Sequence, residues 1–355
     1  MQTSVAEALL LIFAAAVMNA TYTLPMKANR RWAWEHSWLA FSVLGVAVVP
    51  TIIATLALPG LWSIYTQTSP ATLLAMALFG AGWGVSLVFF GLAIPLVGVA
   101  IVFTISLSTS AASGALLPLL MQHRDRVFSP GGLVLLAGIV LIAIGVAFCG
   151  KAGLERDGAK GSGSGKKNFL RGFLFALISG VLGSLLNLGL AYGDGIQQAA
   201  RDRGASAVMS SNAVWLPCVY AGFVPGVLYC LYLMRKNSNT SVLRTHAAWY
   251  YWLMAAFMGL LWYGSILLYS QSTALLGTLG ASIGWPLFLS SIVLMSTVVG
   301  VLTGEWTPSL RGPFRTLLIG LCLLLGAIGV LSEAGRLSSS AQGAIPSRLN
   351  HNDVA

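Results

Sequence analysis

Long apolar runs separated by short polar segments dominate this chain of 355 residues. A membrane-spanning helix needs about 20 mostly apolar residues, because each backbone N–H and C=O inside lipid must be paired within its own segment. Ten runs come close to this length, and they predict an all-α integral membrane protein with ten transmembrane helices. The runs cover residues 6–24, 37–58, 71–93, 96–121, 131–150, 169–192, 209–234, 247–270, 275–302 and 315–331.

The composition agrees with this pattern. Of all residues, 57% are hydrophobic and only 8% are charged, so a soluble domain of this composition could not cover its surface with polar groups. The net charge of +10 comes from short clusters of cations between the apolar runs and not from a continuous basic face. We therefore expect membrane lipid as a partner and exclude nucleic acid.

The cations also predict an orientation. Of the 20 Lys and Arg residues, 14 lie in the segments after the odd-numbered runs or within the first three residues of the run that follows, and cytoplasmic loops are the ones enriched in these residues. Both termini are then periplasmic, and the basic, Trp-rich segment 19–38 lies at the cytoplasmic interface, where Trp32, Trp34 and Trp38 fit an aromatic belt. The first run carries Glu7 and lacks the basic start of a signal peptide, so it is interpreted as a helix of the mature protein.

Two segments of the chain match without a gap. Five residues recur 179 positions later: Gly80, Trp83, Ser86, Leu96 and Gly98 as Gly259, Trp262, Ser265, Leu275 and Gly277. Duplication of a five-helix unit reverses its direction in the membrane, and inverted repeats of this kind are typical of transporters with a midplane site. The predicted organisation is a first repeat at residues 1–150, a flexible cytoplasmic linker at 151–168, a second repeat at 169–335 and a flexible tail at 336–355.

Several motifs resemble those of the L-rhamnose/proton symporter family, within the drug/metabolite transporter superfamily. They are "NATYTLPMK…WAWEHSW", a looser "LFGAGWG…FGLA…LG", "LGASIGW" and "TGEW", and the resemblance extends from Asn19 to Gly329. It implies a carrier of ten helices in the bacterial inner membrane, built from inverted five-helix repeats, that takes up a deoxysugar with protons. A superfamily carrier that exports or exchanges another small metabolite is the alternative.

A sugar site combines convergent polar groups with aromatic rings that pack on the C–H faces of the sugar. The candidates at membrane depth are Asn19, Trp83, Asn187, Asn212, Trp215, Trp262, Tyr263, Gln271, Ser282 and Trp285. For each polar residue, an interhelical hydrogen bond is an equally good explanation. The matched pair of Trp83 and Trp262 fits either the walls of a central site or a symmetric packing contact. A glycine-rich set indicates close helix crossings: Gly80, Gly82, Gly84, Gly277, Gly280 and Gly284.

Acidic residues are scarce, and none lies clearly at the centre of a predicted helix. Glu7 and Asp194 are the candidates for proton coupling, with an ordinary interfacial carboxylate as the alternative for each. Pro25 is expected to end the first helix at Leu24, because proline disfavours helical angles in the residue before it. Lys27 and Glu305 are predicted to lie at the same depth and to form a cytoplasmic gate, unless Glu305 only caps its own loop.

The four cysteines have no CxxC spacing and are interpreted as small buried hydrophobic residues, and the four histidines have no metal-binding spacing. No nucleophile with an adjacent base is evident, so an enzyme is not expected, and no cofactor or metal is predicted. The sequence does not fix the oligomeric state.

Overall fold

The computed structural model describes residues 2–28, 31–97, 99–122, 124–158, 166–245, 249–276, 280–302 and 311–343. Every regular element in these ranges is helical. The first half contains α1 (Gln2–Thr21), α2 (Leu24–Ala28), α3 (Trp34–Phe41), the π-helix η1 (Ser42–Val48), α4 (Val49–Ala57), α5 (Leu61–Gln67), α6 (Pro70–Val97), α7 (Val99–Gln122), the 3-10 helix η2 (Arg124–Arg126) and α8 (Pro130–Gly158). The second half contains α9 (Lys166–Gly183), α10 (Leu185–Tyr192), α11 (Asp194–Arg201), the 3-10 helix η3 (Met209–Ser211), α12 (Asn212–Lys236), α13 (Val242–Thr245), α14 (Trp249–Leu275), α15 (Gly280–Leu302) and α16 (Arg311–Gly343).

Within the described ranges, eight helical segments are long and apolar enough to cross a membrane. They run through α1–α2, α3–α4, α6, α8, α9–α10, η3–α12, α14 and α16. The helices α7 and α15 carry the shorter apolar stretches Ile105–Met121 and Ser282–Ser296. Where their residues are described, the ten predicted runs thus fall mostly on helices.

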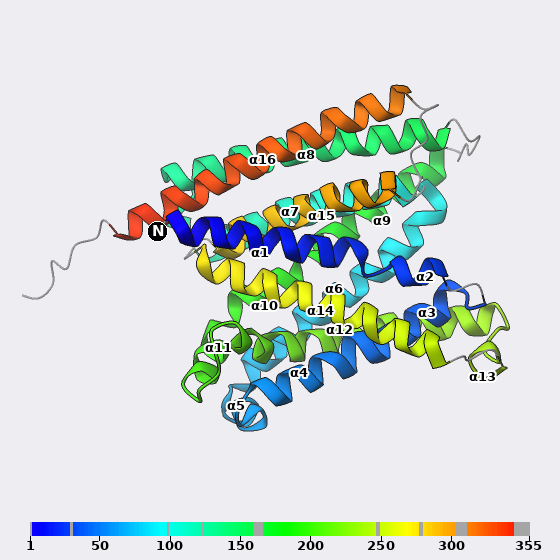
Figure 1. Ribbon diagram of the computed structural model, residues 1–355, viewed down its shortest axis with the longest axis horizontal. Coiled ribbons are helices and arrows are strands. Elements are labelled where there is room, and N and C mark those ends of the chain that lie inside the picture. Colours follow the sequence, from blue (N-terminus) through cyan, green and yellow to red (C-terminus); the bar gives the residue numbers. More distant parts are fainter. Residues whose placement is uncertain are drawn as a thin grey trace, which may run out of the picture.

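The helices form a bundle whose long axes run roughly together (Figure 1). α8 and α16 lie side by side along one edge, and α3, η1, α4 and α12 lie at the opposite edge. Between these edges, α6 packs against α9 and α12, α14 packs against α1 and η1, and α7 packs against α15. The start of α1 and the end of α16 lie at the same end of the bundle, where α5 and α11 are also found, whereas α2 and α13 lie at the other end (Figure 1).

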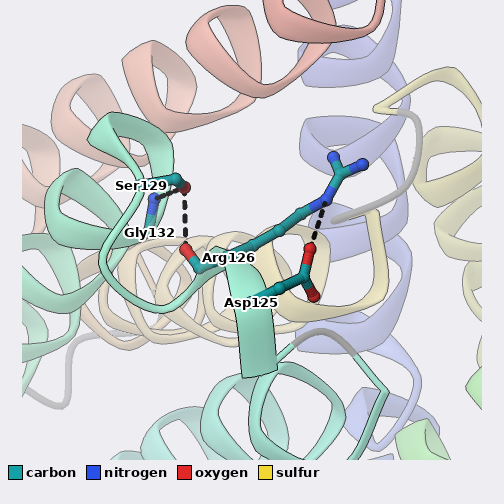
Figure 2. Close-up of polar contacts among 4 residues, drawn as sticks. All are labelled: Asp125, Arg126, Ser129 and Gly132. Carbon is teal, nitrogen blue, oxygen red and sulfur yellow. Dashed lines mark hydrogen bonds and ion pairs between the residues drawn. The ribbon is translucent and has the colours of Figure 1, made fainter.

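The turn between α7 and α8 shows how a spanning helix begins (Figure 2). Ser129 Oγ accepts a 3.1 Å hydrogen bond from the N–H of Gly132 and donates one of 2.7 Å to the Arg126 carbonyl. A serine N-cap followed by proline suits a helix start, because the cap satisfies a free N–H and proline has no N–H to satisfy. Asp125 and Arg126 form a long 3.9 Å pair beside this cap.

The helix crossings depend on glycines, as predicted for Gly80 and Gly84. A Cβ atom on Gly80 would lie 2.7 Å from Cys218 Cα, and one on Gly84 would lie 2.8 Å from Gly222 Cα, so α6 and α12 touch through their backbones. On the other side of the bundle, a Cβ on Gly45 of η1 would lie 2.6 Å from Gly259 Cα of α14. Gly277 lies outside the described residues.

Several predicted boundaries differ from the structure. α1 ends at Thr21 and not at Leu24, and Pro25 lies in the first turn of α2, where proline is tolerated. Thr21 Oγ1 donates a 2.7 Å hydrogen bond to the Val17 carbonyl. This bond gives a carbonyl group in the last turn of α1 a side-chain partner. Both ends of the predicted linker are helical, since α8 continues to Gly158 and α9 begins at Lys166. α16 likewise extends to Gly343, into the predicted tail.

Two predictions of burial also need correction. Trp32 is only 6% exposed, because its ring packs against Tyr251 at 5.0 Å and Trp252 at 5.5 Å, so it does not contribute to a membrane belt. Cys218 and Cys230 are buried as predicted, but Cys322 is exposed on the surface of α16.

Candidate functional site

α14 packs against helices of both halves of the chain and carries several buried polar side chains. Trp262, Tyr263, Ser265, Tyr269 and Ser270 are all at most 6% exposed. Several of these groups also bond to side chains of other helices, because polar groups in lipid surroundings need hydrogen-bond partners. Several of the predicted site residues contact one another through α14.

The predicted pair of Trp83 and Trp262 is in contact. The two rings stack with their centroids 5.5 Å apart and their planes 17° from parallel. Ser86 and Ser265, which follow these residues at the same spacing, each donate a 2.6 Å hydrogen bond to the carbonyl of their own tryptophan. The two matched segments of the sequence therefore have the same local geometry and meet at their tryptophans.

A first group of polar side chains surrounds this pair. Asn19 of α1 donates a 2.9 Å hydrogen bond from Nδ2 to Ser265 Oγ. Tyr263 donates from its hydroxyl to Asn212 Oδ1 at 2.7 Å, and the Asn212 amide donates in turn to the Met209 carbonyl at 2.8 Å. The amides of α1 and α12 are thus fixed against α14.

A second group lies further along α14. Tyr269 donates a hydrogen bond to Asn187 Oδ1, and Asn187 Nδ2 donates to the Gly114 carbonyl at 2.8 Å. The Tyr269 ring meets Trp285 edge to face at 5.4 Å. Trp285 Nε1 donates to the Ser110 carbonyl at 3.0 Å, so this group joins α7, α10, α14 and α15.

The remaining predicted residues are placed differently. Trp215 Nε1 donates to Ser270 Oγ at 2.6 Å, so Trp215 packs on α14 away from the stacked tryptophans. Gln271 is half-buried and makes no hydrogen bond to these groups within the described part of the chain. Ser282 Oγ is buried without a hydrogen-bond partner among the described residues.

The sequence reasoning missed Tyr269 and the serines Ser110, Ser265 and Ser270 as members of these groups. A tyrosine at membrane depth is a usable signal, because a buried phenol needs a partner. Serines are too frequent in this chain to be selected by type alone.

A cavity of about 410 Å³ opens at the end of the bundle that carries α5 and α11. Its polar lining comes from Gln67, Thr68, Thr72, Tyr192 and Arg203, and the Arg203 guanidinium donates to the Gln67 side-chain oxygen. The volume lies within the range of about 300–1,000 Å³ typical of small-molecule sites. At the other end, a cavity of only about 10 Å³ lies beside Trp32 and Tyr251, which is room for about one water molecule.

The predicted charged candidates do not join the buried groups. Glu7 and Asp194 are exposed, and Asp194 lies in the first turn of α11, where a carboxylate suits the helix dipole. The side chain of Lys27 and the whole of Glu305 lie outside the described residues, so the gate stays a prediction. The sequence reasoning also passed over Glu35, which is only 5% exposed at the start of α3.

The chemistry available around α14 is that of neutral donors and acceptors beside aromatic faces. Amides, hydroxyls and indoles from both halves of the chain converge there, and none of the residues joined in these two groups carries a formal charge. Such a set suits an uncharged polar ligand and provides neither a nucleophile nor a metal site.

Comparisons with known proteins agree with this description. Residues 1–334 match the family described as L-rhamnose-proton symport protein (RhaT). Proteins named L-rhamnose-proton symporter, from Yersinia pestis (strain Pestoides F) and from Yersinia pseudotuberculosis serotype O:1b (strain IP 31758), are each 26% identical over 328 residues, covering 89% of this chain and 94% of the relative. A solved crystal structure covers 92% of this chain and 98% of its own with a TM-score of 0.54 and 17% identity, and so shares the fold.

Proposed function

Because this chain belongs to the L-rhamnose-proton symport family, whose members are transporters and not enzymes, we propose that it takes up L-rhamnose or a related deoxysugar together with protons. Transport proceeds by alternating access across the bacterial inner membrane. The observation that carries the proposal is the convergence of neutral amides and tryptophans around α14.

The groups around α14 match the chemistry of a 6-deoxysugar. Its hydroxyls need both donors and acceptors, which Asn19, Asn187 and Asn212 offer once their present partners are exchanged. Its methyl group and C–H faces pack on indole rings, such as those of Trp262 and Trp285. A charged substrate would instead need a compensating charge in lipid surroundings.

The packing of the helices supports two inverted five-helix repeats, with boundaries near residue 150 and residue 169. α6 packs on α9 and α12, and its counterpart α14 packs on α1 and on the α3–α4 segment. α7 packs on α8 and α9, and its counterpart α15 packs on α16 and α1. Exchange of the two halves therefore maps each of these pairs onto another of them, and maps α7–α15 and α8–α16 onto themselves.

In this architecture α7 and α15 are the fourth and ninth of ten spans, which places both termini on the same side. The cation pattern makes that side periplasmic. The cavity beside α5 and α11 is then the periplasmic entrance for the sugar. The small cavity beside Trp32 lies at the closed cytoplasmic end.

Transport into proteoliposomes tests the proposal. Radiolabelled L-rhamnose should accumulate when the outside is made acidic, and a proton ionophore should abolish the accumulation. Trp262→Ala should lower the sugar affinity at least about tenfold, because burial of a large apolar side chain contributes roughly 1.5–3 kcal/mol. Trp249→Ala, at an exposed position on the same helix, is the control. Export of a nucleotide, amine or organic acid without sugar uptake would contradict the proposal.

A further inference from the structure

We propose that Glu35 and His36, at the start of α3, form the proton-binding site of the transport cycle, with His36 Nδ1 as the atom that takes the proton. The proposal rests on the proposed function, because it assumes that sugar and proton move together. It assigns the coupling proton to a pair outside the groups around α14, and to neither Glu7 nor Asp194.

The pair is buried between the two halves of the chain. Glu35 is 5% exposed and His36 is 1% exposed. Glu35 Oε1 accepts hydrogen bonds from Asn237 Nδ2 at 2.8 Å and from Asn239 Nδ2 at 2.7 Å, both in the turn after α12. His36 Nε2 lies 3.0 Å from the Asn239 carbonyl oxygen. A carboxylate this well buried needs such donors, because an unpaired buried charge is costly.

The cluster contains two buried nitrogen or oxygen atoms without a hydrogen-bond partner among the described residues. A carbonyl oxygen only accepts, so His36 Nε2 must carry the hydrogen that joins it to Asn239. In the neutral ring, Nδ1 is then a bare acceptor, and it is buried without a partner among the described residues. Asn239 Oδ1 is a second buried acceptor without a partner in the same part of the structure. Neither atom therefore receives a hydrogen bond within the described part of the chain.

One proton on His36 Nδ1 would change the net charge of the buried pair. The imidazolium would stand beside the Glu35 carboxylate, so the buried pair would change from a net charge of −1 to zero. Histidine is the side chain whose charge ordinarily changes near neutral pH. Because protonation removes a buried net charge, the proton favours the conformation in which the turn after α12 covers the pair.

The surroundings contain few competing charges. Glu35 is the one carboxylate that faces His36 within the described ranges. From α12, Cys230 lies within electrostatic range of Glu35, and Arg235 and Lys236 are exposed at the end of the helix. From α14, the neighbouring titratable group is Tyr251, which interacts with Arg31, and η1 contributes no titratable side chain.

A continuous row of aromatic rings connects the pair to the stacked tryptophans. Trp34, adjacent to Glu35, stacks on Trp38 at 5.2 Å, and Trp38 packs on Phe41 at 5.2 Å. Phe41 meets Trp262 edge to face at 6.0 Å. A displacement of α3 is therefore transmitted directly to a wall of the candidate sugar site.

The segment that follows α3 is suited to such a displacement. η1 is a π-helix, a geometry often found at functional sites, and its Gly45 touches the backbone of Gly259, three residues before Trp262. Opening toward the cytoplasm would separate α3 from the turn after α12, hydrate the pair and release the proton. Sugar and proton would thus leave in the same step.

His36→Gln and Glu35→Gln test the assignment in proteoliposomes, with Glu333→Gln, a partly exposed acid of α16 that pairs with Arg336, as the control. In both cluster variants, sugar accumulation driven by a pH gradient should fall at least about tenfold, while sugar exchange at equal pH on both sides stays within about twofold of wild type. If both variants accumulate sugar like wild type, the assignment is wrong. If wild type itself shows no pH-driven accumulation, the proposed function fails instead.

If a variant folds but no longer exchanges sugar, its sugar affinity can still be measured in detergent. In detergent, the sugar affinity of wild type should change about tenfold between pH 5.5 and pH 8, and that of His36→Gln should be independent of pH. A His36→Gln protein that keeps the wild-type pH dependence overturns the proposal. Thermal unfolding in the same detergent identifies any variant that has not folded.

Discussion

The contact between Gly45 and Gly259 allows a sharp test of how the candidate site is held. In Gly45→Ala, the new Cβ would lie 2.6 Å from Gly259 Cα, whereas two carbon atoms in contact lie about 3.5–4.0 Å apart. The backbones of η1 and α14 must then separate by roughly 1 Å. The Cβ would also lie 2.8 Å from the Phe41 ring, which packs on Trp262.

Overpacking of this kind costs about 1–3 kcal/mol of stability. We therefore expect Gly45→Ala to unfold at a lower temperature and to bind sugar at least about tenfold more weakly, because Trp262 moves with α14.

Gly226→Ala is the matched control, since nothing lies within 4 Å of its new Cβ. That control should be as stable as wild type or slightly more stable, because alanine is the better helix former. Thermal unfolding and sugar binding in detergent measure both effects. Wild-type behaviour of Gly45→Ala would refute the argument that a backbone contact positions Trp262.

Three further predictions concern other parts of the chain. Tyr269→Phe leaves Asn187 Oδ1 without its phenol donor and should cost about 1–3 kcal/mol of stability, measured by thermal unfolding; an unchanged transition would show that the bond contributes nothing. Cysteines introduced at Thr3 and Ser340 should react with an impermeant reagent in intact spheroplasts, and reaction only after lysis would reverse the topology. Glu305→Gln should slow sugar release to the cytoplasm while sugar binding from the periplasmic side persists, and a normal transport rate would remove the predicted gate.

The apolar runs predicted most of the helices, because lipid requires long segments with internally paired backbones and this requirement is visible locally. The contact of Trp83 with Trp262 was also within reach, since the matched register of the two segments singled them out. Helix ends were less predictable. The first helix ends three residues before the position that Pro25 suggested, because a proline in a first turn does not prevent a new helix.

The partners of buried polar residues could not be predicted from the sequence. Glu35 is charged and next to a loop, which ordinarily indicates an exposed side chain. Its burial depends on Asn237 and Asn239, two hundred positions away, and no local pattern contains that information. Trp32 was misplaced for the same reason, because the rings that cover it belong to α14.

The stacked tryptophans also provide the protein with an intrinsic optical reporter. Indoles whose centroids lie 5.5 Å apart at 17° interact as chromophores, so the pair should contribute a distinct near-ultraviolet circular dichroism signal. A sugar ring between them would require about 7–8 Å, two contacts of ~3.5–4.0 Å each, so occupation of the inner faces must part the rings by roughly 2 Å. Titration with substrate would then report the separation of the two rings through a change in this signal, without any attached label. Replacing one of the two tryptophans by phenylalanine would abolish the signal.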